Sequence, residues 1–189
     1  MYNNSLKDNL NRENAVALYC LLVHAFNYQI AFNSNGEYNT PFGADRSYFS
    51  KSLETKLNKY INEIGKRNIK FYSEDFHNLS FDNQDFKNTF YYCDPPYLIT
   101  VGAYEKDYFC KWSESYEREL LNLLDILDYK QVKFALSNVL EHKGKNNDIL
   151  KEWSKKYNVH YLNMDYKNCN YQTKDKSANS SVEVLITNY

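Results

Sequence analysis

The sequence predicts an α/β fold, a largely parallel sheet with helices between its strands, preceded by a separate lobe of helices and a hairpin. Two observations lead to this class. From Ile69 onward, short runs rich in aromatic and β-branched residues alternate with segments of helical periodicity. Such alternation is typical of sheets whose strands run parallel. Residues 1–67 lack it, so we expect them to form a lobe distinct from residues 68–189.

The composition favours a folded protein of a reducing compartment. Of the 189 residues, 43% are hydrophobic and 25% are charged, which argues against disorder. The N-terminus is polar and the longest apolar run, residues 15–26, is too short to cross a bilayer, so we expect neither a signal peptide nor a membrane partner. Cys20 and Cys93 lie in apolar runs that favour buried free thiols. No cysteine has metal-site spacing. We therefore expect a cytoplasmic location and no metal.

Charge is unevenly distributed along the chain although the formal net charge is −1. Residues 45–70 carry seven Lys or Arg against three acids, and residues 143–176 carry eight against four. Residues 71–128, between them, carry four basic and twelve acidic residues. Two basic flanks around an acidic centre would let a polyanion approach from the sides, although solvated surface charge is the commoner explanation of such a pattern.

The N-terminal lobe is predicted to hold two helices and a hairpin. The first helix follows Asn11 as its N-cap and is apolar on nearly every face, which predicts a buried helix. Between two aromatic-bearing arms, "SNGE" predicts a turn in which Asn35 and Gly36 supply positive φ. A second, amphipathic helix is expected within residues 47–68, with Gly65 as its C-cap.

The remaining chain is predicted to alternate strands with helices. Helices are expected at residues 113–127, capped by Ser113 or Ser115, and at 146–157. Ser137 and Asn138 are expected to end the third strand close to the loop that follows the second strand, or to cap a turn there. The predicted strands span residues 69–72, 89–93, 132–138, 159–164 and 181–189.

The stretch "TFYYCDPPY" places Asp94, two prolines and Tyr97 directly after a predicted strand. In open α/β sheets, ligands bind beyond the carboxyl ends of the strands. The prolines lack N–H groups and fix φ, so that the neighbouring carbonyls are held in place. Asp94 accepts hydrogen bonds, and Tyr97 presents a flat ring. These residues predict a pocket for a flat group with an exocyclic amine; the alternative is an ordinary turn after a strand.

Such a pocket answers a specific chemical difficulty. The amine lone pair of adenine is delocalised into the ring, which makes the amine a poor nucleophile. Acceptors at the Asp94 carboxylate and the Pro95 carbonyl would favour the pyramidal amine and stabilise positive charge as it develops on nitrogen. This chemistry requires no metal.

At these residues the sequence resembles the DNA adenine-N6 methyltransferases of the Dam-like (D12) class, whose hallmark is DPPY after an apolar strand. The segment "FNYQIAFNSNGEYNTPFG" resembles the target-recognition segment of that family, and "FYSEDF" resembles its segment that contacts the adenine of S-adenosylmethionine. The segments "ALSN" and "EVLITNY" resemble its strands after DPPY. The resemblance covers nearly the whole chain in the family's order.

The resemblance implies an incomplete Rossmann-like methyltransferase sheet in residues 68–189 and a target-recognition lobe in residues 1–67. It implies transfer of a methyl group from S-adenosylmethionine to the N6 amine of an adenine flipped out of double-stranded DNA, as in restriction–modification. The implied catalytic residues are Asp94, Pro95, Pro96 and Tyr97, the implied cofactor contacts are Asp75, Phe76 and Asp94, and the implied DNA contacts are Asn27, Tyr28, Gln29, Asn33 and Asn39.

The sequence departs from the family pattern at two places. None of its five glycines forms the GxG of the family's cofactor loop, and Ala31 stands where the family commonly has Arg before its aromatic–Asn pair. We therefore expect the chain to need a complementing N-terminal methyltransferase segment or subunit. The alternative is a catalytically inactive, truncated remnant that binds DNA or another protein. No role is assigned to the four histidines.

Overall fold

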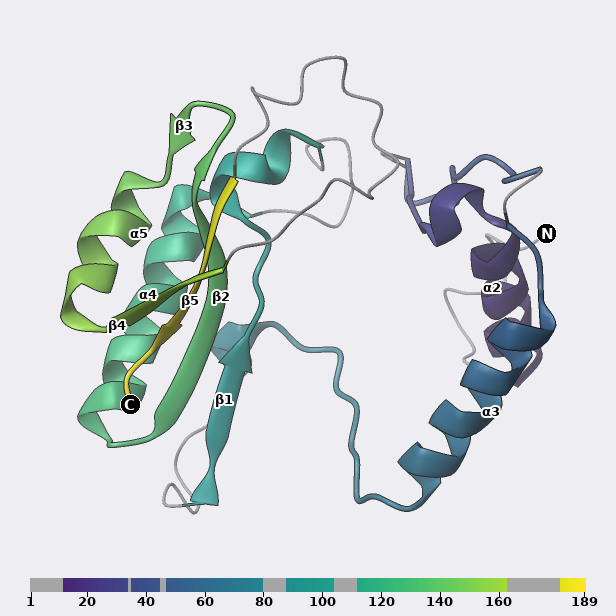
Figure 1. The fold of residues 1–189 in the computed structure, drawn as a ribbon, viewed down its shortest axis with the longest axis horizontal. Coiled ribbons are helices and arrows are strands. Elements are labelled where there is room, and N and C mark those ends of the chain that lie inside the picture. The colour runs from purple at the N-terminus through teal and green to yellow at the C-terminus, as the bar shows by residue number, and fades with distance from the viewer. Residues whose placement is uncertain (1–11, 34, 45–46, 80–87, 104–111, 163–180) are drawn as a thin grey trace. The chain divides into compact units, whose positions relative to one another are not determined.

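The structure is a computed structural model, shown in Figure 1, and it describes residues 12–33, 35–44, 47–79, 88–103, 112–162 and 181–189. These residues fall into two compact units. Unit 1 holds the described residues up to Glu74, and unit 2 holds those from Asp75 onward. No helix in the described part of the chain is long and apolar enough to span a membrane.

Unit 1 contains the two expected helices, α2 (Arg12–His24) and α3 (Lys51–Gly65), and between them the short helix η1 (Phe26–Tyr28). The hairpin is reduced to an isolated antiparallel bridge between Phe32 and Tyr38. In its turn only Gly36 has the expected positive φ, of 75°; Asn35 does not. The segment therefore turns as the sequence predicts, with Gly36 but not Asn35 in the left-handed conformation.

Three expectations for unit 1 are wrong: that α2 is a buried helix, that Cys20 is a buried thiol and that Gly65 is the C-cap of α3. Val23 is the only buried residue of α2, and Cys20 is exposed. A helix is buried only if other elements pack on all its faces. The described part of unit 1 contains one other α-helix and isolated β-bridges, so most of α2 stays accessible to solvent. At α3, Gly65 is the last helical residue and the right-handed Lys66 is the C-cap. Ser50 caps the other end, where its hydroxyl accepts from the Leu53 N–H at 3.2 Å.

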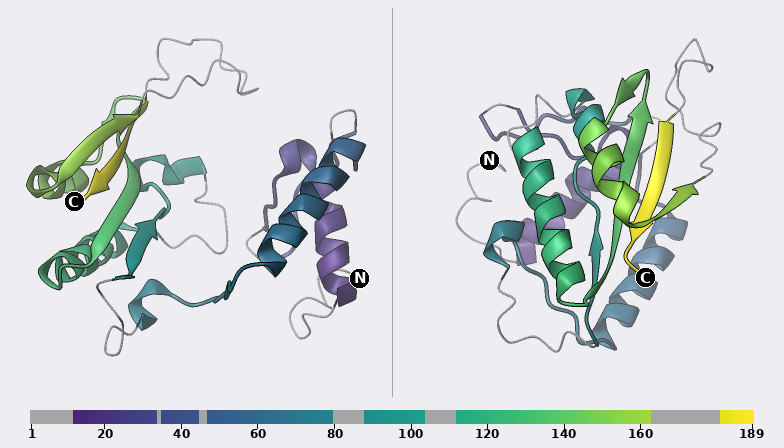
Figure 2. Two further views of the ribbon diagram at one scale, coloured as in Figure 1. Left: turned by 60° about the horizontal axis from the view of Figure 1, so that its bottom comes forward. Right: turned by 90° about the vertical axis from the view of Figure 1, so that its left-hand side faces the viewer.

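Unit 2 is an α/β structure built on a five-stranded sheet, with the order β1-β2-β5-β4 and β3 paired to β2. Figure 2 shows its helices beside the sheet. The elements are η2 (Phe76–Asn78), β1 (Phe90–Cys93), η4 (Leu98–Ala103), α4 (Glu114–Tyr129), β2 (Lys133–His142), β3 (Lys145–Asn146), α5 (Asp148–Trp153), η5 (Ser154–Lys156), β4 (Asn158–Leu162) and β5 (Ser181–Thr187).

The expectation of a largely parallel sheet is wrong, because among the strands that the structure describes only the β1–β2 pair is parallel. Strands β2 and β4, which α5 connects, do run in the same direction, since each is antiparallel to β5. Strand β5 lies between them and runs the opposite way, so both of its pairings are antiparallel. The alternation of strands and helices along the chain predicts that strands joined by a helix run in the same direction. It does not predict that the last strand, β5, lies between two of them.

Two further strand predictions differ from the structure. Residues 69–72 form no strand, and β2 continues to His142 instead of ending at Ser137 and Asn138. The predicted helices are confirmed: Ser113 caps α4, with its hydroxyl accepting from the Tyr116 N–H at 3.4 Å, and α5 lies within its expected range.

The core of unit 2 lies between the sheet and the helices α4 and α5. Leucines of α4 recur at the spacing of one helical face and pack on alternate residues of β2 and β5. Burial of such side chains contributes roughly 1.5–3 kcal/mol each, so this face holds β2 firmly in place. The fully buried apolar residues include Leu124, Leu127, Phe134, Leu136, Leu150, Val184 and Ile186.

Candidate active site

The DPPY loop begins where β1 ends, beside the middle of β2. The last residue of β1, Cys93, pairs with Leu136, so that Asp94 and Ser137 come next on neighbouring parallel strands. Strand β2 continues past this point because it carries its own apolar face against α4 and pairs with β5. Asp94 is therefore presented at the carboxyl end of a strand, as the sequence predicts, with a β2 side chain directly beside it.

Three side chains form a closed hydrogen-bonded group at this point. The Ser137 hydroxyl donates to Asp94 Oδ1 at 2.8 Å, and the Tyr97 hydroxyl donates to the same oxygen at 3.1 Å. The two hydroxyl oxygens are themselves 3.1 Å apart. Two donors on one carboxylate oxygen fix the orientation of the Asp94 side chain. From the sequence, Ser137 is expected near this loop but at the end of a strand, and its contact with Asp94 is not predicted.

The same group leaves two acceptors open. Among the described residues, no donor contacts Asp94 Oδ2 or the carbonyl of Pro95. Pro95 is half-buried and Pro96 is exposed, and neither has an N–H to donate. Two acceptors on consecutive residues, without described donors, could both be satisfied by a primary amine with two N–H groups.

Tyr97 is held as a neutral phenol. Burial raises the pKa of its hydroxyl, and the hydrogen bond with Ser137 opposes that shift in part. Its carbonyl accepts from the Thr100 N–H at 2.9 Å and the Thr100 hydroxyl at 3.0 Å, at the start of η4. The ring of Tyr97 is thus anchored through its backbone on one side and its hydroxyl on the other.

The two predicted cofactor contacts, Asp75 and Phe76, lie at the start of η2. Asp75 Oδ1 accepts from the His77 N–H at 3.0 Å and contacts His77 Nδ1, while His77 Nε2 contacts Glu119 on α4. The side-chain bond to Asp75, and then that to Glu119, raises the pKa of His77. The backbone hydrogen bond from His77 lowers the pKa of Asp75. No sequence signal joins His77 to Glu119, because 42 residues separate them.

Phe76 belongs to an aromatic cluster on the edge of the core. Its ring centroid lies 6.0 Å from those of Trp112 and Tyr116. An adenine ring requires an aromatic face and an acceptor for its amine; Phe76 offers the first, and Asp75 Oδ2, which no described residue contacts, offers the second. These residue types fit the adenine end of S-adenosylmethionine. No hydrogen bond among the described residues joins Asp75 to Asp94.

A buried network behind the site was missed by the sequence analysis. Glu117, 1% exposed, accepts from Asn138 Nδ2 at 3.1 Å and Asn147 Nδ2 at 3.0 Å through Oε1, and from Trp112 Nε1 at 2.8 Å through Oε2. Burial raises the pKa of Glu117, and the hydrogen bonds from these three donors lower it in part. The network joins α4, β2 and the N-cap of α5 directly behind Ser137. Its sequence signal is the spacing that places Glu117 on the apolar face of α4.

The predicted DNA contacts lie in unit 1. Asn27 and Tyr28 are exposed and both have left-handed backbones, with φ of 54° and 56°; Gln29 beside them is exposed as well. The Asn33 side chain is occupied by the turn: Oδ1 accepts from the N–H groups of residues 35 and 37, at 3.0 and 2.9 Å, and Nδ2 donates to the Glu37 carboxylate at 2.9 Å. Asn39 is exposed, with its own N–H bonded to the Ala31 carbonyl at 2.9 Å.

Comparison with known proteins decides the family. A model of the D12 class N6 adenine-specific DNA methyltransferases matches residues 2–168, and DPPY lies within that range. The chain belongs to this family. In the described part of this D12 chain, no group of three or more His, Cys, Asp or Glu residues could hold a metal ion.

Three relatives of this D12 methyltransferase chain bear names of modification enzymes. The chain is 48% identical over 174 residues to type II methyltransferase M.FokI of Planomicrobium okeanokoites. The matched region covers 91% of this chain and 26% of that protein. Modification methylase StsI of Streptococcus sanguinis is 42% identical over 180 residues (93% and 27%). Modification methylase LlaI of Lactococcus lactis subsp. lactis is 32% identical over 190 residues (98% and 28%). The chain spans about a quarter of the length of these relatives.

Proposed function

We propose that this chain is the part of a methyltransferase that binds double-stranded DNA and presents a flipped adenine N6 amine for methylation. The observation that carries the proposal is the pair of open acceptors, Asp94 Oδ2 and the Pro95 carbonyl, beside an anchored Tyr97. Residues 68–189 would form the catalytic part, as an incomplete Rossmann-like sheet, and residues 1–67 the target-recognition lobe.

The chemistry follows from the two acceptors. When both amine hydrogens of adenine bond to these acceptors, the amine nitrogen becomes pyramidal. Its lone pair is then no longer conjugated with the ring and becomes nucleophilic. The negative Asp94 then stabilises the positive charge that develops on N6. Ser137 and Tyr97 hold Asp94 Oδ1, so that Oδ2 faces the amine without a rotation of the side chain. Bound S-adenosylmethionine supplies the electrophilic methyl group.

Tyr97 would stack on the flipped base. Unstacking a base from duplex DNA costs a few kcal/mol, and stacking on one aromatic ring returns about 1–3 kcal/mol. The ring is already fixed at both ends, so little conformational freedom is lost when the base arrives.

Asp75 and Phe76 would hold the adenine of the cofactor, with Asp94 near its reactive end. The sequence has no GxG loop for the methionine end, so we propose that residues outside this sequence complete that part of the pocket. Strand β1 offers a place for them: it ends the order β1-β2-β5-β4, and no described strand pairs with its second edge.

In the recognition lobe, Asn27, Tyr28, Gln29 and Asn39 are the proposed DNA contacts. Asn33 acts instead as the residue that shapes the turn, because its amide group is engaged on both sides. The other four present exposed side chains from a segment with unusual backbone geometry, where Tyr28 would serve as a wedge when the duplex opens.

The test is product analysis. The purified chain, supplied with a complementing segment that carries the GxG cofactor loop, is incubated with double-stranded DNA and S-adenosylmethionine, and the DNA is digested to nucleosides and analysed by mass spectrometry. N6-methyladenine formed by the unchanged chain and by Glu114→Ala, but not by Asp94→Ala, supports the proposal. Methylated cytosine would contradict it. A folded chain that binds DNA and forms no methylated base even with the complementing segment present would favour the non-catalytic remnant.

A further inference from the structure

Strand β2 extends well beyond the active site and ends in a tight, charged turn. It pairs with β1 only as far as Leu136 and continues to His142, where it turns into β3. Lys143 and Gly144 both have positive φ, 49° and 77°, which is the geometry of a two-residue hairpin turn. Lys145 begins β3 on the other side of the turn.

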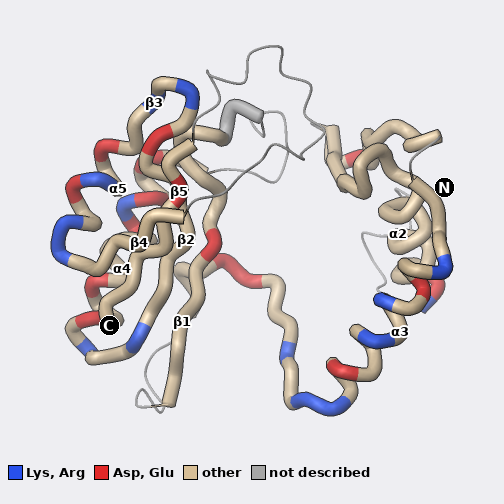
Figure 3. The backbone as a smooth tube through the Cα atoms, viewed as in Figure 1, with Lys and Arg blue, Asp and Glu red and all other residues tan. Residues whose placement is uncertain are grey.

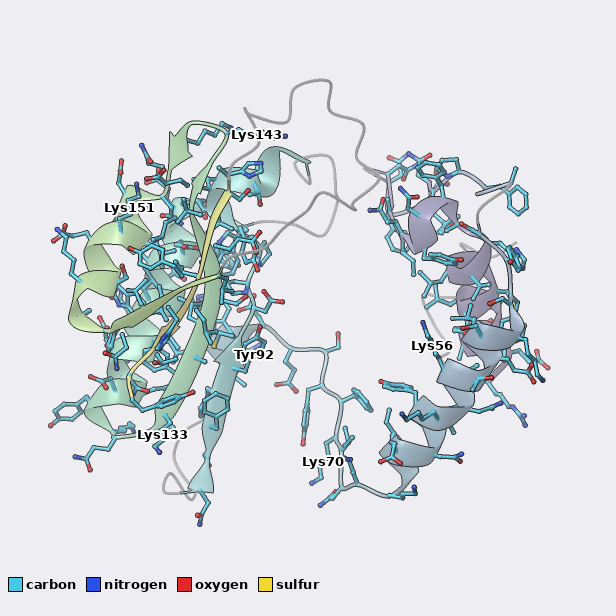
Figure 4. The ribbon with its side chains drawn as sticks, viewed as in Figure 1. Lys56, Lys70, Tyr92, Lys133, Lys143 and Lys151 are labelled. Atoms are coloured by element: carbon cyan, nitrogen blue, oxygen red, sulfur yellow. The ribbon has the colours of Figure 1, made fainter. Side chains whose placement is uncertain are left out.

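The turn lies on the same edge of the sheet as the DPPY loop. Strands β1 and β2 are parallel, and Ser137 contacts Asp94, so everything after Ser137 in β2 projects past the active site. His142 is five positions beyond Ser137 along β2, a length of about 17 Å at roughly 3.3 Å per strand residue. Figure 4 shows Lys143 and Lys133 at opposite ends of this strand.

The two lysines of the turn are exposed and uncompensated. Among the described residues, neither Lys143 nor Lys145 has an ion-pair partner, whereas Lys151 nearby is paired with Glu141. Figure 3 shows the resulting basic segment at the turn. Burial lowers the pKa of His142, these two cations lower it further, and Glu183 opposes the shift.

The residue choice at the turn is also informative. A left-handed φ suits Gly, Asn or Asp, and a long side chain such as Lys adopts it at some cost. Lys143 nevertheless holds that position, where its ammonium group extends from the tip of the hairpin. The turn therefore carries two cations, without an ion-pair partner among the described residues, beyond the DPPY loop.

We propose that Lys143 and Lys145 bind the phosphate backbone of the DNA whose adenine enters the Asp94 site. This inference rests on the proposed function and adds a contact surface outside the recognition lobe. A duplex carries one phosphate per about 1.7 Å of its axis, so about ten phosphates fall within a span equal to the distance from Ser137 to the turn. Cations fixed at that distance would orient the duplex while the base occupies the pocket.

The test measures the salt dependence of DNA binding. The full chain, carrying Lys143→Asn and Lys145→Gln together, is titrated with a fluorescent mixed-sequence 24-bp duplex at several KCl concentrations. Asn keeps the left-handed turn, so the loss of charge is separated from loss of the turn. The control, Lys133→Gln with Lys155→Gln, removes two charges from the opposite edge of the sheet.

Each phosphate contact contributes about 0.9 to the slope of log K against log salt, so we expect the turn variant to lower the slope by about 1.8. The control should keep the slope of the unchanged chain. An unchanged slope in the turn variant, or an equal drop in the control, overturns this inference and leaves the proposed function standing. If the unchanged chain binds no duplex, the proposed function fails, and this inference fails with it.

Discussion

Replacing Glu117 with alanine removes the acceptor of three side-chain donors at once. Asn138 and Asn147 are 2% and 1% exposed, so water cannot replace the lost carboxylate for them, whereas Trp112 is only half-buried. A buried donor left unpaired costs about 1–3 kcal/mol. Two such donors give about 2–6 kcal/mol, and relief from burying a carboxylate offsets part of it. We expect unfolding free energy to fall by about 3 kcal/mol.

Urea unfolding followed by tryptophan fluorescence measures this loss in the correct unit, because both tryptophans, Trp112 and Trp153, lie in unit 2. At a slope of roughly 1–3 kcal/mol per molar urea, the midpoint should fall by about 1–3 M. Glu114→Ala, an exposed acid in the same helical turn, is the control and should change stability by about 0.5 kcal/mol or less.

The isosteric variant Glu117→Gln sharpens the test. Its carbonyl can still accept from both asparagines, while its NH2 group faces the Trp112 N–H, so a loss of about 1 kcal/mol is expected. If alanine and glutamine cost the same, or if neither differs from Glu114→Ala, the argument that Glu117 is the shared acceptor is refuted.

Three further predictions concern the site and its surroundings. Ser137→Ala should lower kcat of methyl transfer about tenfold without changing KM for DNA, since it removes a donor that orients Asp94, and Ser137→Thr should restore kcat; a change in KM alone would contradict this role. His77 lies between two carboxylates that raise its pKa. The stabilisation from these ion pairs is fully present below the ordinary pKa of 6.5 and is lost as the pH rises through the raised pKa. An NMR titration midpoint of His77 at or below 6.5 would contradict this. Burial raises the pKa of Cys93 to about 11, so at pH 8 about one thiol in a thousand is ionised, and peptide mapping after iodoacetamide treatment should find exposed Cys20 alkylated first. Faster alkylation of Cys93 would refute the burial argument.

The sequence predicts those parts of the fold that depend on local pattern. The leucine spacing of α4, its Ser113 cap and the apolar run before Asp94 each act within a few residues, and the structure contains all three. The position of Asp94 at a strand end follows from the same kind of signal. The α/β class is therefore visible without coordinates.

The parts that the sequence does not predict depend on contacts between distant segments. β5 lies between β2 and β4 and pairs with residues more than twenty positions away. Both pairings are antiparallel, where a parallel sheet was expected. Ser137 meets Asp94 across 43 residues, and His77 meets Glu119 across 42. Each contact depends on strand register or helix placement, which no single segment encodes.

The variant Asp94→Asn tests the central claim most directly. Ser137 and Tyr97 both donate to Oδ1, so an asparagine there would turn its oxygen toward them and its NH2 group toward the substrate amine. A donor would then face a donor. The account predicts that the single-turnover rate of N6-adenine methylation falls at least about a hundredfold, close to that of Asp94→Ala, while DNA binding is retained. A rate within a few-fold of the unchanged chain would contradict the account, because Oδ2 would then not be the atom that accepts the adenine amine.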